Sequence, residues 1–161
     1  MTQLTISTRA YGQGPATARL TLPFELRQRS RLLAALDSGE EVGLIMPRGT
    51  VLRGGDRLQS SDGRLVEVVA APEELSVVRS SDARQLARAA YHLGNRHVAL
   101  QITADSVRYQ HDHVLDDMLR GMGLAVSVEL LPFEPEAGAY ASAHAHGDAH
   151  AHGHAQHHDH G

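Results

Sequence analysis

The sequence predicts an α+β protein made of two small domains and a tail. We expect an all-β domain over residues 1–74, a domain of mixed helices and strands over residues 75–136, and a disordered His-rich tail over residues 137–161. Three observations predict this division. Short apolar runs separated by turn residues fill the first part, and helix-length apolar stripes alternate with strands in the second. The last part contains almost nothing that could form a core.

The first domain is predicted from strands that alternate apolar and polar residues. Residues 4–7, 18–22 and 65–69 have this pattern, and Pro47 to Gly49 marks a turn. Residues 27–36 leave two possibilities open, a helix or an irregular strand. Several short strands at this spacing are typical of a small sandwich or barrel-like module.

The second domain is predicted from the order of its elements. A helix is expected to begin after Ser81 or Asp82 as the N-cap and to run to Leu93, with Gly94 just past its end. A second helix is expected from about residue 112 to 122. The predicted strands are residues 75–78, 98–102, 106–109 and 124–130. The order β-α-β-β-α-β is that of ferredoxin-like folds, with an antiparallel sheet and both helices on one face.

Composition and missing motifs exclude several functional classes. The chain has no cysteine, so disulfides, thiolate metal sites and cysteine nucleophiles are excluded. A net charge of −4 gives no support for nucleic acid or an anionic membrane as partner. We see no signal peptide and no apolar run of roughly 18–20 residues, so a cytoplasmic location is expected. Because no phosphate loop, nucleophile elbow or His-Glu-x-x-His motif is present, we do not expect an enzyme.

Histidine is the residue type that indicates a function. Eight of the twelve histidines fall in the tail, mostly separated by one residue, so that a flexible chain can wrap pairs of imidazoles around one metal ion. Low-complexity drift and a purification tag are the alternatives, although tags are usually uninterrupted. The tail histidines are His144, His146, His150, His152, His154, His157, His158 and His160.

Three histidines in the second domain are further candidate ligands. His97 follows the first predicted helix, and a single imidazole there becomes a competent site only if a two-fold dimer presents it twice. His111 and His113 flank Asp112 at the start of the second helix. Either all three side chains reach one ion, or Asp112 caps the helix and the two histidines are solvated.

Several motifs together resemble the UreE family of urease accessory proteins, which are nickel metallochaperones. The resemblance rests on Tyr-His-Leu-Gly-Asn-Arg-His at residues 91–97, on the stretch from His111 to Leu119, and on residues 131–140, Leu-Pro-Phe-Glu-Pro-Glu-Ala-Gly-Ala-Tyr. Residues 27–31 and 46–53 are similar to the first domain of that family. The match covers nearly the whole chain.

The resemblance implies a function and a set of roles. The protein would supply Ni²⁺ to apo-urease, with His97 of each protomer binding nickel across a homodimer formed by the second domain. His111 and His113 would form auxiliary sites, the tail would collect further nickel, and Zn²⁺ or Cu²⁺ would also fit these imidazoles. The first domain would contact protein partners, among them the accessory GTPase UreG and the urease apoprotein–accessory complex. Gln110 stands where some members have another histidine. The alternative is a general zinc, copper or nickel storage protein acting through its tail.

Overall fold

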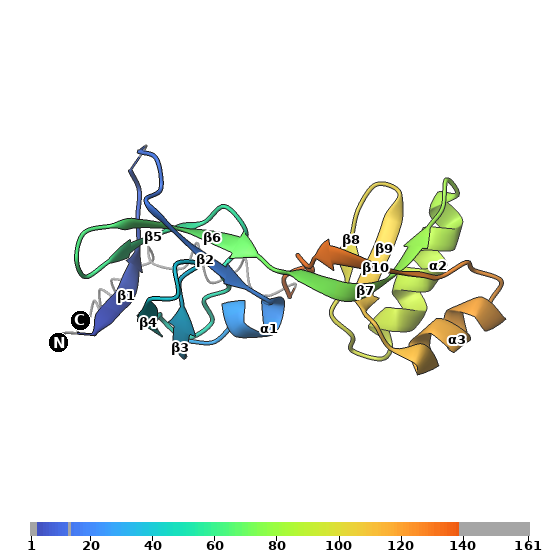
Figure 1. Ribbon diagram of the computed structural model, residues 1–161. Helices are drawn as coiled ribbons and strands as arrows, with labels where there is room; N and C mark the ends of the chain where they lie inside the picture. The colour runs from blue at the N-terminus through green and yellow to red at the C-terminus, as the bar shows by residue number, and fades with distance from the viewer. Residues whose placement is uncertain (1–2, 13, 139–161) are drawn as a thin grey trace, which may run out of the picture.

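The computed structural model describes residues 3–12 and 14–138 of the chain. Ten strands and three helices in these residues form two lobes, each with its own sheet (Figure 1). The predicted mixture of helices and strands is therefore confirmed. No helix in this part of the chain is long and apolar enough to cross a membrane.

The first lobe is built on a six-stranded sheet with the order β2-β6-β5-β1-β4-β3. Two neighbouring pairs, β1 with β4 and β2 with β6, are parallel, and the other pairs are antiparallel. The strands are β1 (Leu4–Arg9), β2 (Ala18–Leu22), β3 (Arg31–Ala35), β4 (Glu41–Ile45), β5 (Arg57–Ser60) and β6 (Leu65–Ala70). Alternate side chains of these strands, such as Val66 and Val68 of β6, are fully buried in one apolar cluster.

The open choice over residues 27–36 is decided in favour of a strand. Arg27 is the last residue of α1 (Phe24–Arg27), a single helical turn, and most of the remaining segment forms β3. Leu32 and Ala34 point into the apolar cluster, and the residues between them are exposed, which is the two-residue period of a strand. The first lobe is therefore not purely β, because α1 interrupts its strands.

The second lobe is a four-stranded antiparallel sheet with the order β10-β7-β9-β8. Strand β7 (Pro72–Arg79) begins two residues after β6 ends, so a nearly continuous extended segment connects the lobes (Figure 1). The other elements of the second lobe are α2 (Ala83–Gly94), β8 (Gln101–Ile102), β9 (Ser106–Gln110), α3 (His113–Gly121) and β10 (Ser127–Pro132). The sequence order of these elements is β-α-β-β-α-β.

Both long helices pack on one face of this sheet. Leu86 and Leu93 of α2, Leu119 of α3, and Val107 and Tyr109 of β9 belong to one buried cluster. Both helices begin at aspartate caps: Asp82 accepts a hydrogen bond from the backbone of Arg84, and Asp112 from those of Val114 and Leu115. Asp82 was one of the two residues predicted to cap the first helix.

Two predicted strands differ in extent from those observed. Residues 98–102 form a strand only at β8, because the carbonyl of Leu100 accepts a hydrogen bond from Glu136 rather than from a sheet neighbour. The last strand starts at Ser127 instead of residue 124. Leu124 packs into the helix cluster after Gly123, which turns the chain with a φ of 85°.

A buried arginine joins the two lobes. Arg27, at the end of α1, has no exposed surface and donates hydrogen bonds to the carbonyls of Leu22 and Leu52 in the first lobe. It also donates to the carbonyl of Phe133 and to the Glu134 carboxylate, just after β10. Phe24 meets Phe133 edge to face at 5.7 Å, beside Leu75 and Val77 on the sheet face that the helices leave free.

Replacing Arg27 should therefore be costly. Arg27→Ala removes the donor to the carbonyls of Leu52 and Phe133 and leaves Glu134 without its partner, while the Leu22 carbonyl keeps the amide of Ala71. We expect the free energy of unfolding to fall by about 3 kcal/mol. The matched control is Arg29→Ala, which breaks only the exposed pair with Glu25 at 2.8 Å and should cost less than about 0.5 kcal/mol. Urea denaturation followed by circular dichroism measures both. Equal losses in the two variants would contradict the structural role of Arg27.

Candidate metal site

His97 occupies an exposed turn with an unusual backbone conformation. The turn follows α2, where the amide of His97 donates to the carbonyl of Gly94 at 3.0 Å. Its φ of 55° lies in the left-handed region, and no other non-glycine residue of the described chain has a positive φ. This conformation costs an L-residue about 1–2 kcal/mol and is often retained at functional positions. The turn presents the imidazole to solvent.

His111 lies just past the end of β9 and is held by specific contacts. Its amide donates to the carbonyl of Glu74, which extends the pairing of β9 with β7. Its ring Nδ1 lies 3.1 Å from Oδ2 of Asp116 and 3.1 Å from Oγ of Ser76. The side chain is one-third exposed, whereas Asp116, on α3, is buried. The ring therefore has one buried edge and one open edge.

The polar group behind His111 contains a buried tyrosine. Tyr109 donates a hydrogen bond from its hydroxyl to Oδ1 of Asp116 at 2.5 Å. Burial of the ring, followed by this hydrogen bond, raises the pKa of Tyr109 well above its usual value. The hydroxyl of Ser76 lies 3.1 Å from Nδ1 of His111 on the other side of the same group. Ser76, Tyr109, Asp116 and His111 therefore form one connected polar cluster, at the edge of the apolar core.

His113 is the first residue of α3 and is exposed. Asp112 is the N-cap of this helix: its Oδ1 accepts from the amides of Val114 and Leu115 at 2.9 and 3.2 Å. Of the two interpretations of His111-Asp112-His113, the geometry favours the helix cap. Among residues 3–12 and 14–138, no three His, Asp or Glu side chains are grouped so that they could hold one metal ion.

The remaining candidate ligands are outside the described residues. These are His144, His146, His150, His152, His154, His157, His158 and His160 of the tail. The described chain ends beside the second lobe, since the amide of Glu136 donates to the carbonyl of Leu100 at 2.6 Å. Leu100 follows His97 by three positions.

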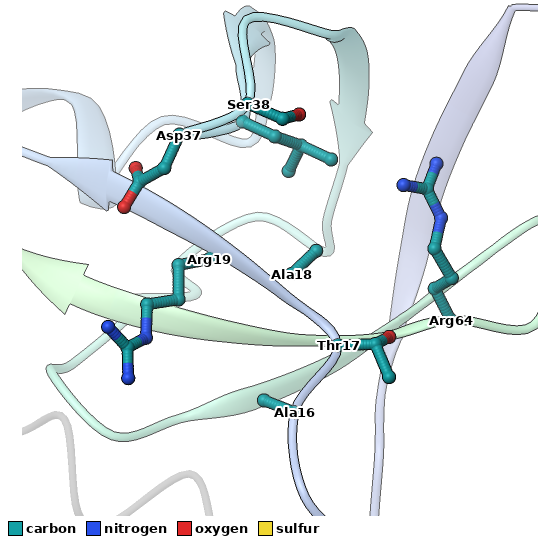
Figure 2. A pocket seen from close by; sticks show the side chains of 8 residues that line it. Ala16, Thr17, Ala18, Arg19, Asp37, Ser38 and Arg64 are labelled. Atoms are coloured by element: carbon teal, nitrogen blue, oxygen red, sulfur yellow. The ribbon is translucent and has the colours of Figure 1, made fainter.

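A pocket in the first lobe is separate from these histidines. It has a volume of about 410 Å³, and Arg19, Asp37 and Arg64 contribute its charged side chains (Figure 2). Arg64 is paired with Glu40 and Asp62, and Asp37 accepts a hydrogen bond from Thr21. Since these groups already have partners and the lining contains no histidine, the pocket does not indicate a metal site.

Asp116 is the buried side chain beside His111 that the sequence analysis did not predict. The predicted apolar stripe of this helix consists of Val114, Leu115, Met118, Leu119 and Met122. In the structure Val114 is 57% exposed, while Asp116 is buried beside Leu119, three residues further along the same face. The sequence signal that could have indicated this position is its spacing: Asp116 comes three positions before Leu119, on the same helix face, and five positions after His111.

These features define a two-lobed protein of mixed helices and strands, with separate, accessible histidines on the second lobe. Two family models match the chain: the N-terminal domain of the UreE urease accessory protein over residues 6–71, and its C-terminal domain over residues 73–160. The chain belongs to the UreE family of urease accessory proteins.

Individual relatives agree with this assignment. The chain is 60% identical to the urease accessory protein UreE of Alkalilimnicola ehrlichii over 137 residues, which cover 85% of this chain and 84% of the relative. It is 56% identical to the UreE of an Enterobacter species over 140 residues, covering 86% and 92%. The UreE of Citrobacter koseri is 61% identical over 127 residues, covering 78% and 84%.

The buried Tyr109 predicts a specific dependence of stability on alkaline pH. Its folded-state pKa is raised above the unfolded value of about 10. The stabilisation is therefore complete below pH 10 and is lost as the pH rises above it, because only the unfolded state then loses the proton. Between about pH 9 and pH 11 we expect the unfolding free energy to fall more steeply for the native sequence than for Tyr109→Phe.

Urea denaturation at several pH values measures this difference. At neutral pH, Tyr109→Phe should be about 1–3 kcal/mol less stable, because Asp116 loses a buried donor. The control is Tyr91→Phe, at a residue that is 66% exposed, which should change neither the stability nor its slope with pH. Parallel pH profiles for the native sequence and Tyr109→Phe would show that Tyr109 is not preferentially neutral in the folded state.

Proposed function

We propose that this protein is a cytoplasmic nickel metallochaperone that acts in urease maturation and is not itself an enzyme. Membership of a urease accessory family supports the role in maturation, and the chemistry of the histidines supports the metal. In this proposal Ni²⁺ is cargo, which the protein passes through the accessory GTPase UreG to the urease apoprotein–accessory complex.

The observation that carries the proposal is the geometry of His97. Its imidazole is exposed on a strained turn, and the described chain offers no cluster of three ligands around it. A single imidazole cannot hold a metal ion tightly, but a two-fold dimer presents it twice near the axis. We therefore propose that His97 of each protomer binds one shared Ni²⁺, while His111 and His113 bind auxiliary ions.

We propose that residues 75–136 are a ferredoxin-like domain that binds metal and dimerises. Large apolar side chains remain exposed on this domain in a single chain: Tyr91 at 66%, Val114 at 57% and Leu130 at 73%. Exposed apolar area of this kind is often buried in protein–protein contacts. The order and direction of the strands in the second sheet support the ferredoxin-like assignment.

We propose that residues 1–74 contact protein partners. Leu33 and Ile45 are 60% and 51% exposed on the outer face of the adjacent strands β3 and β4. Strand β3 is also an edge strand, so its outer backbone groups are free of sheet pairing. Both features suit a surface for the accessory proteins of urease maturation.

The tail, residues 137–161, would collect nickel for the folded site. Glu136 contacts Leu100, so the chain enters the tail close to the His97 turn. The eight positions from Glu136 to His144 cover at most about 26 Å when extended, which is enough for tail imidazoles to approach His97. The same eight tail histidines support the alternative, a general zinc, copper or nickel buffer, in which the folded domains only carry the tail.

Nickel titration calorimetry with mass determination in solution separates the two functions. We compare the full chain, residues 1–138, and residues 1–138 carrying either His97→Asn or His92→Asn. Asparagine tolerates the left-handed conformation, so His97→Asn removes the imidazole without straining the turn. We expect residues 1–138 to keep about one tight Ni²⁺ per dimer, and His97→Asn to weaken it at least about 100-fold.

The His92 variant is the matched control. His92 is on α2, where its ring meets Tyr91 edge to face at 5.2 Å, and we assign it no ligand role. His92→Asn should leave nickel affinity unchanged. Loss of all tight binding on removal of the tail alone would favour the storage function instead.

A further inference from the structure

The second domain holds its two auxiliary histidines in different ways. The ring of His111 contacts Asp116 and Ser76 through Nδ1, each at 3.1 Å. The exposed side chain of His113 makes no hydrogen bond to any of residues 3–12 and 14–138. We propose that Asp116 is a positioning residue for His111: it fixes the Nδ1–H tautomer and the ring orientation, so that Nε2 is the atom offered to the metal. The part of this inference that concerns metal binding by Nε2 rests on the proposed function.

The arrangement of Asp116 determines which ring atom carries the proton. Asp116 is 1% exposed, and Tyr109 donates to its Oδ1. Its Oδ2 therefore faces Nδ1 of His111 as an acceptor. On this proposal Nδ1 is the donor in the pair, because a carboxylate in its ionised form only accepts hydrogen bonds. In the neutral imidazole the lone pair is then on Nε2.

The rest of the cluster makes this orientation rigid. The amide of His111 is tied to the carbonyl of Glu74, and the next residue, Asp112, caps α3. Asp116 is on the same helix, so both ends of the contact belong to elements packed on one core. Ser76 on β7 lies at hydrogen-bond distance from the same ring atom, and its hydroxyl can accept the Nδ1 proton that the proposal assigns. The ring cannot rotate without leaving the buried Asp116 oxygen unpaired, which is unfavourable.

This positioning matters for a metal ligand. Ligating histidines commonly donate their second ring N–H to a carboxylate, which orients the ring and increases the basicity of the ligating nitrogen. Removing such a partner typically lowers metal affinity 10–100-fold. His111 would therefore be the stronger and more precisely placed of the two auxiliary ligands, because His113 has no comparable contact in the described structure.

Nuclear magnetic resonance of the metal-free full chain tests the tautomer directly. Long-range ¹H–¹⁵N spectra at about pH 8.5, where imidazoles are neutral, distinguish the two ring nitrogens. His111→Gln and His113→Gln assign the signals. We expect His111 to be protonated at Nδ1, and His113 to show the Nε2–H form that unconstrained imidazole favours.

Asp116→Asn should invert the result for His111. In this variant the Tyr109 hydroxyl still needs an acceptor, so the amide oxygen of Asn takes the position of Oδ1. The amide NH₂ group then faces Nδ1 of His111 and donates a hydrogen bond to that nitrogen. The His111 proton should move to Nε2. The control is Asp117→Asn, the next residue on α3, whose side chain is 75% exposed and should leave the tautomer unchanged.

A titration with Zn²⁺, used as a diamagnetic probe, tests the consequence for metal binding. We expect the Zn²⁺ concentration that half-shifts the His111 ring signals to rise 10–100-fold in Asp116→Asn, with no change for the His97 signals. An Nε2–H tautomer in the native protein, an unchanged tautomer in Asp116→Asn, or an unchanged Zn²⁺ midpoint would each overturn the inference. If the tautomer behaves as expected but Zn²⁺ shifts no His111 signal, the positioning stands and the proposed ligand role of His111 fails.

Discussion

One buried guanidinium lies at the centre of the junction between the two lobes of this protein. Arg27 donates to Leu22 and Leu52 on one side and to Phe133 and Glu134 on the other. A buried charge is tolerated only when such hydrogen bonds replace its hydration. Since the second sheet meets the first lobe through its Leu75–Val77 face, its helices must cover the opposite face. Arg27 also holds residues 133 and 134 in place, and the amide of Glu136 then donates to the carbonyl of Leu100.

The histidines of the second lobe show two opposite designs. His97 is exposed on a strained turn and, among the described residues, makes only a backbone hydrogen bond. On the proposed function its ring is therefore open to a second protomer or a client protein. His111 is anchored by Asp116 and Ser76. A chaperone must both hold its cargo and release it. On the proposed function, an accessible all-imidazole site allows a partner's ligands to replace its own, while an anchored ligand retains metal at lower free concentrations.

How much the sequence could predict depends on the range of each interaction. Local signals predicted both long helices, and Asp82 and Asp112 do cap them. Periodicity could not decide residues 27–36, because the strand there depends on pairing with β4 and the preceding turn on the burial of Arg27. The two partners of Arg27 in the second lobe lie 106 and 107 residues away, too far along the chain for a local sequence pattern to reveal them. Asp116 contacts His111, which is only five positions earlier in the chain. The helix was predicted from the spacing of its apolar residues, however, and that pattern gives no information about a buried carboxylate.

The place where the tail begins gives it a physical advantage over a free peptide of the same composition. A flexible chain pays conformational entropy whenever two imidazoles close on one ion, so each tail site should be weak. Glu136 is held at Leu100, three positions after His97, so on the proposed function only a short linker would separate His97 from an ion bound by the first tail histidines. Short flexible linkers give effective concentrations in the millimolar range. On the proposed function, weak tail sites and one shared folded site therefore cooperate without contacting each other: the tail raises the local supply of nickel, and the dimer site selects and holds it. This gain should matter most when free nickel is scarce, because at saturating nickel His97 fills without help.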